Sequence, residues 1–497
     1  MVNFSDLTFI FRFLPVFILC FYLTPARYRT FTLLLGSLVF YAVGDLKMFP
    51  VLLGAVVINF LFGRALFSHK NKGLLIFIIA LDALMLVEFK LLGQFVPGSL
   101  VPIGISFFTF KMISYQVDNY KSKIESEPSF VKVAAYFCMF PQIISGPIMR
   151  YEDFEKNEFC KAASPIEPGD DEENSEDVSD SDDIVEKQED MNVIDLDEVY
   201  QDKKSEQKKG IIRILESLED GFRFFIVGLA MKVLLADHLA MLWKDIGTIG
   251  YESISTPLAW LGALTYSMEL YFDFWGYSLM AAGVGVMLGF PFIVNFAQPY
   301  SSKTVSEFYR RWHATLGSWF KDYIYIPMGG SRYKDARTVL NLLTVWLITG
   351  FWHGVTLNFI LWGLIIFVII LCERYILPRL PRFAHSLIGR INVLVLIPLS
   401  WVVFAISDKI MLRDYFARLF PFFGIGISVN EGDFIKNLQI YAVILVCSLV
   451  LMIPGLYAYF EKHRKHPAFT VVLLVLLWAC VYSLSNAAGN PFMYFKF

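Results

Sequence analysis

Charge and cysteine are both scarce in this chain. Only 18% of its 497 residues are charged, whereas soluble domains carry about a quarter. The six cysteines are scattered without a CxxC pair, which gives no sign of a disulfide framework or a zinc ribbon. The chain also lacks a GxSxG nucleophile elbow and a Walker-type phosphate loop. These absences exclude the common soluble hydrolases and P-loop nucleotide enzymes.

Two partial motifs do not indicate binding sites, because of the residues around them. His463 and His466 have a metal-ligand spacing, but the lysines and arginine beside them oppose a bound cation, so we expect no metal site. Gly283, Gly285 and Gly289 resemble a dinucleotide fingerprint with its second gap one residue too long. They lie in an apolar run, which favours helix packing through small residues.

Long apolar runs dominate what is present. The chain is 56% hydrophobic, with 48 Phe, 24 Tyr and 10 Trp, and its mean hydropathy is +0.53. A straight membrane span needs roughly 20 apolar residues, and several runs here are shorter or broken by Pro or Gly. We therefore predict an all-α polytopic membrane protein. It should have about ten to twelve transmembrane helices, with re-entrant and interfacial helices around a central cavity.

Basic loops predict the orientation in the membrane. Lys and Arg follow the first, third and fifth apolar runs, and the strongest cluster covers residues 303–337. By the positive-inside rule these loops are cytoplasmic, which places the N-terminus outside. Residues 131–147 then have cytoplasmic flanks at both ends, and a re-entrant hairpin satisfies that parity. The predicted location is the cell (inner) membrane.

One segment has the opposite composition. Residues 170–198 hold 15 acidic side chains and one Lys, few aromatics and many Ser and Asp. This composition predicts a disordered cytoplasmic insert, which serves either as a solvated spacer or as a docking segment. The predicted organisation is N-terminal transmembrane helices with the hairpin (1–159), the acidic insert (160–210) and a transmembrane core with C-terminal helices (211–497).

His353 lies between two apolar runs, 338–351 and 355–372. An ionisable group at membrane depth is expensive, so it indicates a functional residue by default. A hydrogen bond to a neighbouring helix is the alternative.

The basic cluster at 303–337 precedes His353. It contains two arginines, a tryptophan and a histidine in a row, at 310–313. We interpret residues 305–326 as an amphipathic helix at the cytoplasmic interface, with its aromatics at headgroup depth. Its cations suit either headgroup anchoring or an anionic, phosphate-bearing donor. The donor-binding candidates are Arg310, Arg311, Lys321 and Arg332.

Several motifs in fixed order resemble the membrane-bound O-acyltransferase family, and within it the branch with the membrane subunit of bacterial alginate O-acetyltransferase. They cover nearly the whole chain outside the acidic insert. They are PIGISFFTF at 102–110, FPQ at 140–142, YFDFWGYS at 271–278, NF at 295–296, SEFYRRWH at 306–313, DYIYIPMGG at 322–330, WHG at 352–354 and PFMYFKF at 491–497.

The resemblance implies roles for individual residues. His353 would be the intramembrane catalytic histidine and His313 a second, motif-borne histidine. For His313 the residues alone leave catalysis or donor positioning open against a structural hydrogen bond. A neutral imidazole suits the removal of a proton from an attacking hydroxyl. The cavity would be lined by Tyr271, Asp273, Trp352 and Trp362.

The resemblance also implies the reaction. An acyl group, expected to be acetyl, would pass from a cytoplasmic thioester such as acetyl-CoA to a cell-surface polysaccharide, or to an exported SGNH-type acyltransferase. Arg310, Arg311 and His313 would border the inner mouth of a passage that narrows at His353. Two alternatives stay open, D-alanyl transfer to teichoic acid from a carrier protein and a flippase for a lipid-linked sugar. We expect no bound cofactor and no nucleic-acid partner, and contact with membrane lipid.

Overall fold

Helices form the whole regular structure of the part of the chain that the computed structural model describes, residues 4–96, 101–157, 159, 210–332, 335–423 and 432–486. The predicted insert 160–210 and the closing motif at 491–497 lie almost wholly outside these residues. Six helical segments are long and apolar enough to cross a membrane, namely Phe49–Ser68, Gly210–Ile249, Leu357–Arg379, Arg382–Ala405, Asp433–Leu451 and Pro467–Asn486. The all-helical fold is confirmed, while the higher count of spans stays a prediction.

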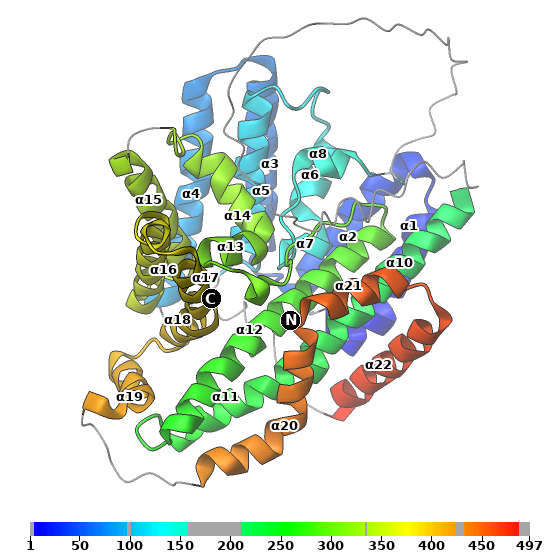
Figure 1. Ribbon diagram of the computed structural model, residues 1–497. Helices are drawn as coiled ribbons and strands as arrows, with labels where there is room; N and C mark the ends of the chain where they lie inside the picture. The colour runs from blue at the N-terminus through cyan, green and yellow to red at the C-terminus, as the bar shows by residue number, and fades with distance from the viewer. Residues whose placement is uncertain are drawn as a thin grey trace, which may run out of the picture.

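The N-terminal part is a group of helices in which α3, α4 and α5 stand side by side (Figure 1). Its elements are η1 (Phe9–Phe13), α1 (Leu14–Leu23), η2 (Ala26–Tyr28), α2 (Arg29–Gly44), α3 (Phe49–Ser68), α4 (Lys72–Phe95), α5 (Ile105–Tyr120), α6 (Phe130–Cys138), α7 (Phe140–Ile143) and α8 (Tyr151–Glu155). The predicted hairpin region contains α6 and α7, which are nine and four residues long. At about 1.5 Å per residue neither helix is long enough to cross a bilayer.

The centre of the molecule is α12 (Thr256–Met287), a 32-residue helix that is buried over most of its length. It follows α10 (Gly210–Ala230), the π-helical turn η3 (Met231–Ala236) and α11 (Asp237–Ile249). A Cβ atom on Gly283 would lie 2.5 Å from the carbonyl oxygen of Gly221, so α10 and α12 cross where neither helix carries a side chain. The packing role predicted for three glycines is confirmed for Gly283, whereas Gly289 lies past the end of α12 in a turn with a φ of +86°.

Short helices sit between the N-terminal group and the α15–α16 pair (Figure 1). They are η4 (Pro299–Ser301), α13 (Val305–Arg311), α14 (Ala314–Phe320) and η5 (Lys321–Tyr325), followed by α15 (Asp335–His353) and α16 (Leu357–Tyr375). The single interfacial helix predicted for 305–326 is therefore wrong, because the chain breaks at Trp312 and His313. Four of its aromatic side chains are also buried inside the protein, namely Phe308, Trp312, Trp319 and Phe320, and Trp319 is only 3% exposed.

The remaining helices surround this core. They are η6 (Leu377–Arg379), α17 (Arg382–Ile391), η7 (Asn392–Leu396), α18 (Ile397–Ala405), α19 (Lys409–Leu419), η8 (Pro421–Phe423), α20 (Asp433–Leu451), α21 (Pro454–His463) and α22 (Pro467–Asn486). Of these, α18 packs against α16 and α12, and α22 packs along α10 (Figure 1). These contacts place α18 beside the end of α15, where His353 lies.

Candidate functional site

A cavity of about 820 Å³ contains both candidate histidines. Its walls come from α13, α14, η5, α15, α16 and α18, and both His313 and His353 line it. Both imidazoles are buried, with 3% and 6% of their residue surface exposed. The two histidines are 40 positions apart in sequence, and the fold brings them to one space.

His313 occupies an unusual turn between α13 and α14. Its φ of +47° lies in the left-handed region, which residues other than glycine rarely adopt. The backbone N–H groups of Leu316 and Gly317 donate to the His313 carbonyl at 3.0 and 3.1 Å, which starts α14. Ala314 donates to the carbonyl of Asn295 at 2.9 Å and holds the turn from the other side. The strained turn is therefore fixed by the fold around it.

The side chain of Asn295 determines the proton position on His313. Its Oδ1 accepts the backbone N–H of Thr315 at 3.3 Å and the Thr315 hydroxyl at 2.8 Å, and its Nδ2 donates to Ser278 Oγ at 3.0 Å. Because Oδ1 is thereby the acceptor, His313 Nδ1, 3.0 Å away, must be its donor. His313 Nε2 then carries the lone pair, and it has no hydrogen-bond partner among the described residues.

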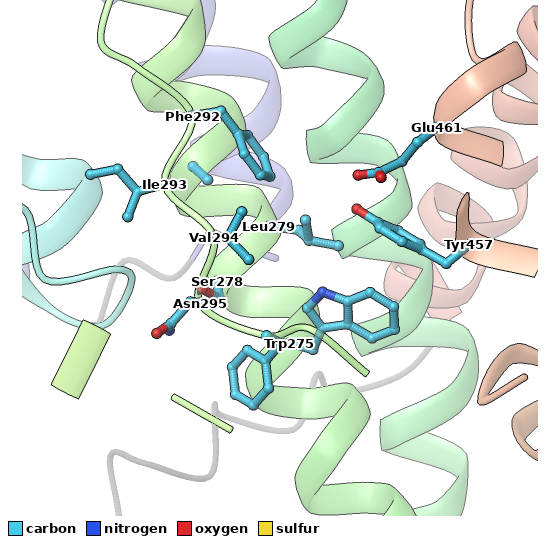
Figure 2. A pocket seen from close by; sticks show the side chains of 11 residues that line it. Trp275, Ser278, Leu279, Phe292, Ile293, Val294, Asn295, Tyr457 and Glu461 are labelled. Atoms are coloured by element: carbon cyan, nitrogen blue, oxygen red, sulfur yellow. Dashed lines mark hydrogen bonds between the residues drawn. The ribbon is translucent and has the colours of Figure 1, made fainter. Parts of the chain in front are cut away.

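The other side of the 290–296 segment borders a much smaller cavity. Figure 2 shows Asn295 beside Ser278, pointing away from the Trp275 ring, with Tyr457 and Glu461 opposite. This cavity measures about 10 Å³, barely the room that one water needs. It cannot hold a thioester, so the larger cavity is the candidate site.

Aromatic rings enclose His353 at the end of α15. Its ring centroid lies 4.4 Å from that of Trp352, 5.0 Å from that of Phe404 and 5.2 Å from that of Trp362. Two of these rings meet His353 nearly perpendicularly, at 82° and 88°. Such packing holds the imidazole in one orientation toward the cavity.

Two glycines let α15 and α16 come close enough to form this wall. A Cβ on Gly363 would lie 2.5 Å from the carbonyl oxygen of Trp346, and one on Gly350 would lie 2.6 Å from that of Phe359. Both contacts are to backbone atoms, which cannot swing aside. The close approach of the two helices thus requires glycine at both positions.

The four predicted donor-binding cations divide into two groups. Arg310 and Lys321 are exposed and line the cavity, and Arg374 lines it too, although the sequence did not single it out. Arg311 instead pairs with Glu307 at 2.6 Å and donates to Ser301 Oγ at 3.1 Å. Neither Arg311 nor the exposed Arg332 belongs to the described lining.

Glu373 has a structural role that the sequence analysis did not predict. Its carboxylate, 7% exposed on α16, accepts the backbone N–H groups of Val305 and Ser306 at 2.7 and 3.0 Å. A carboxylate at a helix N-terminus is favoured by the helix dipole. Glu373 therefore fixes the start of α13, the helix that carries Arg310. A lone acid late in an apolar span was the signal for it.

Only one of the four predicted cavity residues belongs to the described lining. Trp362 lines the cavity, whereas Tyr271, Asp273 and Trp352 lie outside the described lining. Tyr271 packs against Trp312, which does line it, at a centroid distance of 6.0 Å. Asp273 forms an ion pair with Lys232 at 2.8 Å in the α12–η3 interface.

The buried pair of Asp273 belongs to a larger ion cluster. Lys232 also contacts Asp237 at 2.6 Å, and the side chains of Lys232 and Asp273 are each only 3% exposed. Buried charges persist when each has a partner. Asp273 therefore joins α12 to η3.

Chemically, the cavity combines two buried imidazoles with a cationic rim. An imidazole lone pair can take a proton from a hydroxyl, and arginine and lysine can hold phosphate oxygens. The described residues contain no group of three or more His, Cys, Asp or Glu side chains that could hold a metal ion.

Comparisons with known proteins identify the family of the chain. Residues 196–386 match the family model of MBOAT, the membrane-bound O-acyltransferase family. The probable alginate O-acetylase AlgI of Pseudomonas aeruginosa is 30% identical over 482 residues, 92% of this chain and 82% of that protein. The peptidoglycan O-acetyltransferase of Helicobacter pylori is 30% identical over 408 residues, 73% of this chain and 68% of that protein.

A third relative is named for the transfer of D-alanine instead of acetate. The teichoic acid D-alanyltransferase of Bacillus subtilis is 27% identical over 281 residues, 55% of this chain and 59% of that protein. With its apolar helices and these relatives, the protein is a multi-pass membrane acyltransferase. The chain, with both histidines in one cavity, belongs to the membrane-bound O-acyltransferase family.

Proposed function

We propose that this protein transfers an acetyl group from acetyl-CoA on the cytoplasmic side to an exported polysaccharide or to an exported partner acyltransferase. The observation that carries this proposal is the shared cavity, in which two buried histidines meet a rim of Arg310, Lys321 and Arg374. The relatives named for O-acetylation of alginate and of peptidoglycan support the choice of acetyl and of a glycan acceptor.

In the proposed mechanism the hydroxyl oxygen of the acceptor attacks the thioester carbonyl carbon. His353 takes the hydroxyl proton as the C–O bond forms, and the proton passes to the thiolate as the C–S bond breaks. A positioned base of this kind contributes about 10²–10⁴-fold. His313 assists by accepting a hydrogen bond at Nε2, which the Asn295 bond leaves as the lone-pair nitrogen.

The rim would bind the donor. Coenzyme A carries phosphate groups, and Arg and Lys at close quarters hold phosphates by charge-assisted hydrogen bonds. Arg310, Lys321 and Arg374 come from α13, η5 and α16, so they converge on one opening from three directions. Trp346 and Trp362 line the interior, where an apolar wall excludes water from the thioester.

D-alanyl transfer from a carrier protein is the second candidate, favoured by the relative from Bacillus subtilis. One experiment separates the two. The purified protein in proteoliposomes is supplied with labelled acetyl-CoA or with a D-alanyl carrier protein, together with acceptor glycan and any partner acyltransferase encoded beside it. Label transfer from acetyl-CoA that His353→Ala abolishes supports our proposal. Transfer from the carrier protein alone refutes it.

A further inference from the structure

A second cavity of about 270 Å³ lies beside the site, on the far side of Trp352. It is bordered by α4, α5, the α14–η5 segment and the end of α15. Phe320 contributes to the walls of both cavities. Since Trp352 also contacts the His353 ring, one indole layer separates this space from the candidate base.

The second cavity is a slot that follows one face of α4. The residues of α4 that line it are Ile79, Ala83, Leu86, Val87 and Lys90, spaced in the three- and four-residue steps of a single helix face. Between the first and last of them the helix rises about 16 Å. The opposite walls are almost entirely aromatic and aliphatic. An apolar cavity that follows about three turns of a helix suits a hydrocarbon chain.

Lys90 supplies a charge at one end of the slot. Its Nζ lies 6.0 Å above the Trp352 ring, and it has no hydrogen bond or ion pair with any residue of the described part of the chain. Among the other polar groups in the lining, the Tyr323 hydroxyl donates to Asp118 at 2.6 Å and the Trp319 indole donates to the Phe110 carbonyl at 3.0 Å. The slot therefore offers one open cation and otherwise apolar walls, the complement of an anionic amphiphile.

The position of Lys90 along α4 agrees with a headgroup. Lys72 begins the helix, and Lys90 lies about 27 Å farther along its axis, so the two cations mark opposite ends of α4. On its outer face α4 exposes Phe77 by 56% and Leu84 by 62%, side chains suited to lipid. An amphiphile could enter sideways from the bilayer and place its charged end at Lys90.

We propose that this slot binds one acyl chain of an anionic phospholipid, with the phosphate-bearing headgroup at Lys90. The proposal does not depend on the identity of the acyl donor or acceptor. It rests on the shape of the slot, the apolar lining and the single cation.

Lipid retention by the purified protein tests this site. The detergent-solubilised protein is incubated with dioleoyl phosphatidylglycerol or dioleoyl phosphatidylcholine, washed, and its retained lipid is counted by native mass spectrometry. A nearby cation is expected to favour the anionic lipid about fivefold. Lys90→Gln should remove that preference, and Lys90→Arg should restore it. Equal retention of the two lipids by the wild type, or an unchanged preference in Lys90→Gln, overturns the proposal.

Variants of α4 test the slot itself. Ala83→Trp fills it and should lower retention of both lipids, whereas Leu84→Trp, on the exposed face, should not. Lys409→Gln removes an exposed cation elsewhere and should keep the preference.

A wild-type measurement avoids any folding defect in these variants. Phosphatidylglycerol with a diazirine in its acyl tail should crosslink to residues 79–90 of α4 or to Ile113 and Val117 of α5. Crosslinks found only at residues that do not line the slot would assign the anionic lipid to another surface and overturn the proposal.

Discussion

His313 donates its Nδ1 proton to Oδ1 of Asn295 across 3.0 Å, which leaves Nε2 as the nitrogen that can accept a proton in the cavity. Asn295→Ala should free the imidazole to adopt the other tautomer. We expect kcat to fall about tenfold or more, part of the ~10²–10⁴-fold that a positioned base contributes. Steady-state transfer from labelled acetyl-CoA measures this.

The conservative variant separates orientation from folding. Asn295→Asp keeps an acceptor for His313 Nδ1 and Thr315, so it should recover a large part of kcat, with little change in the KM for acetyl-CoA. Equal loss in both variants, at equal thermal stability, would show that the tautomer of His313 is irrelevant to the reaction.

His353→Ala should abolish acyl transfer while the protein still inserts and purifies normally. The imidazole makes ring contacts with Trp362 and Phe404, and its loss leaves a hole about one ring in size without an unpaired charge. Glycan acetylation is measured at matched protein level. Retention of more than a few per cent of wild-type activity would remove His353 from the role of base.

Cations of the rim should contribute to binding of the acyl donor, whereas an exposed cation outside the rim should not. Arg310→Ala combined with Lys321→Ala should raise the KM for acetyl-CoA, and the defect should grow at high salt because the remaining attraction is screened. Arg332→Ala, at an exposed position outside the lining, is the matched control and should leave KM unchanged. Similar effects from Arg332 and from the pair would point to diffuse surface charge instead of a donor site.

Replacing residues 170–198 with a short Gly/Ser linker should leave transfer activity intact. The segment is outside the described residues, and its composition is too polar and acidic to bury a core. Activity and membrane expression of the shortened chain are compared with wild type. Loss of activity at normal expression would assign the insert to partner docking.

The sequence was most informative where a residue type is unusual for its surroundings. A histidine between two apolar runs predicted His353, and the ordered motifs predicted that His313 would join it. Both now lie in one cavity. Aromatic and basic composition could not predict the break at Trp312 and His313, because the left-handed turn is held by Asn295 from another part of the chain.

Motif membership proved a poor guide to which side chains line the cavity. Tyr271 and Asp273 share a motif, yet one packs behind Trp312 and the other pairs with Lys232. Glu373 and Arg374 lie at the end of an apolar span, and only the fold shows that one fixes α13 and the other faces the cavity. Periodicity gives the face of a helix, but the neighbour of that face depends on tertiary packing.

The turn that carries His313 depends on segments made at very different times during synthesis. Trp319 donates to the carbonyl of Phe110 at 3.0 Å, Asn295 holds the imidazole, and Glu373 holds the start of α13. The last of these emerges from the ribosome 60 residues after His313. A nascent chain therefore completes this pocket only after α16 has been made and has joined the bundle.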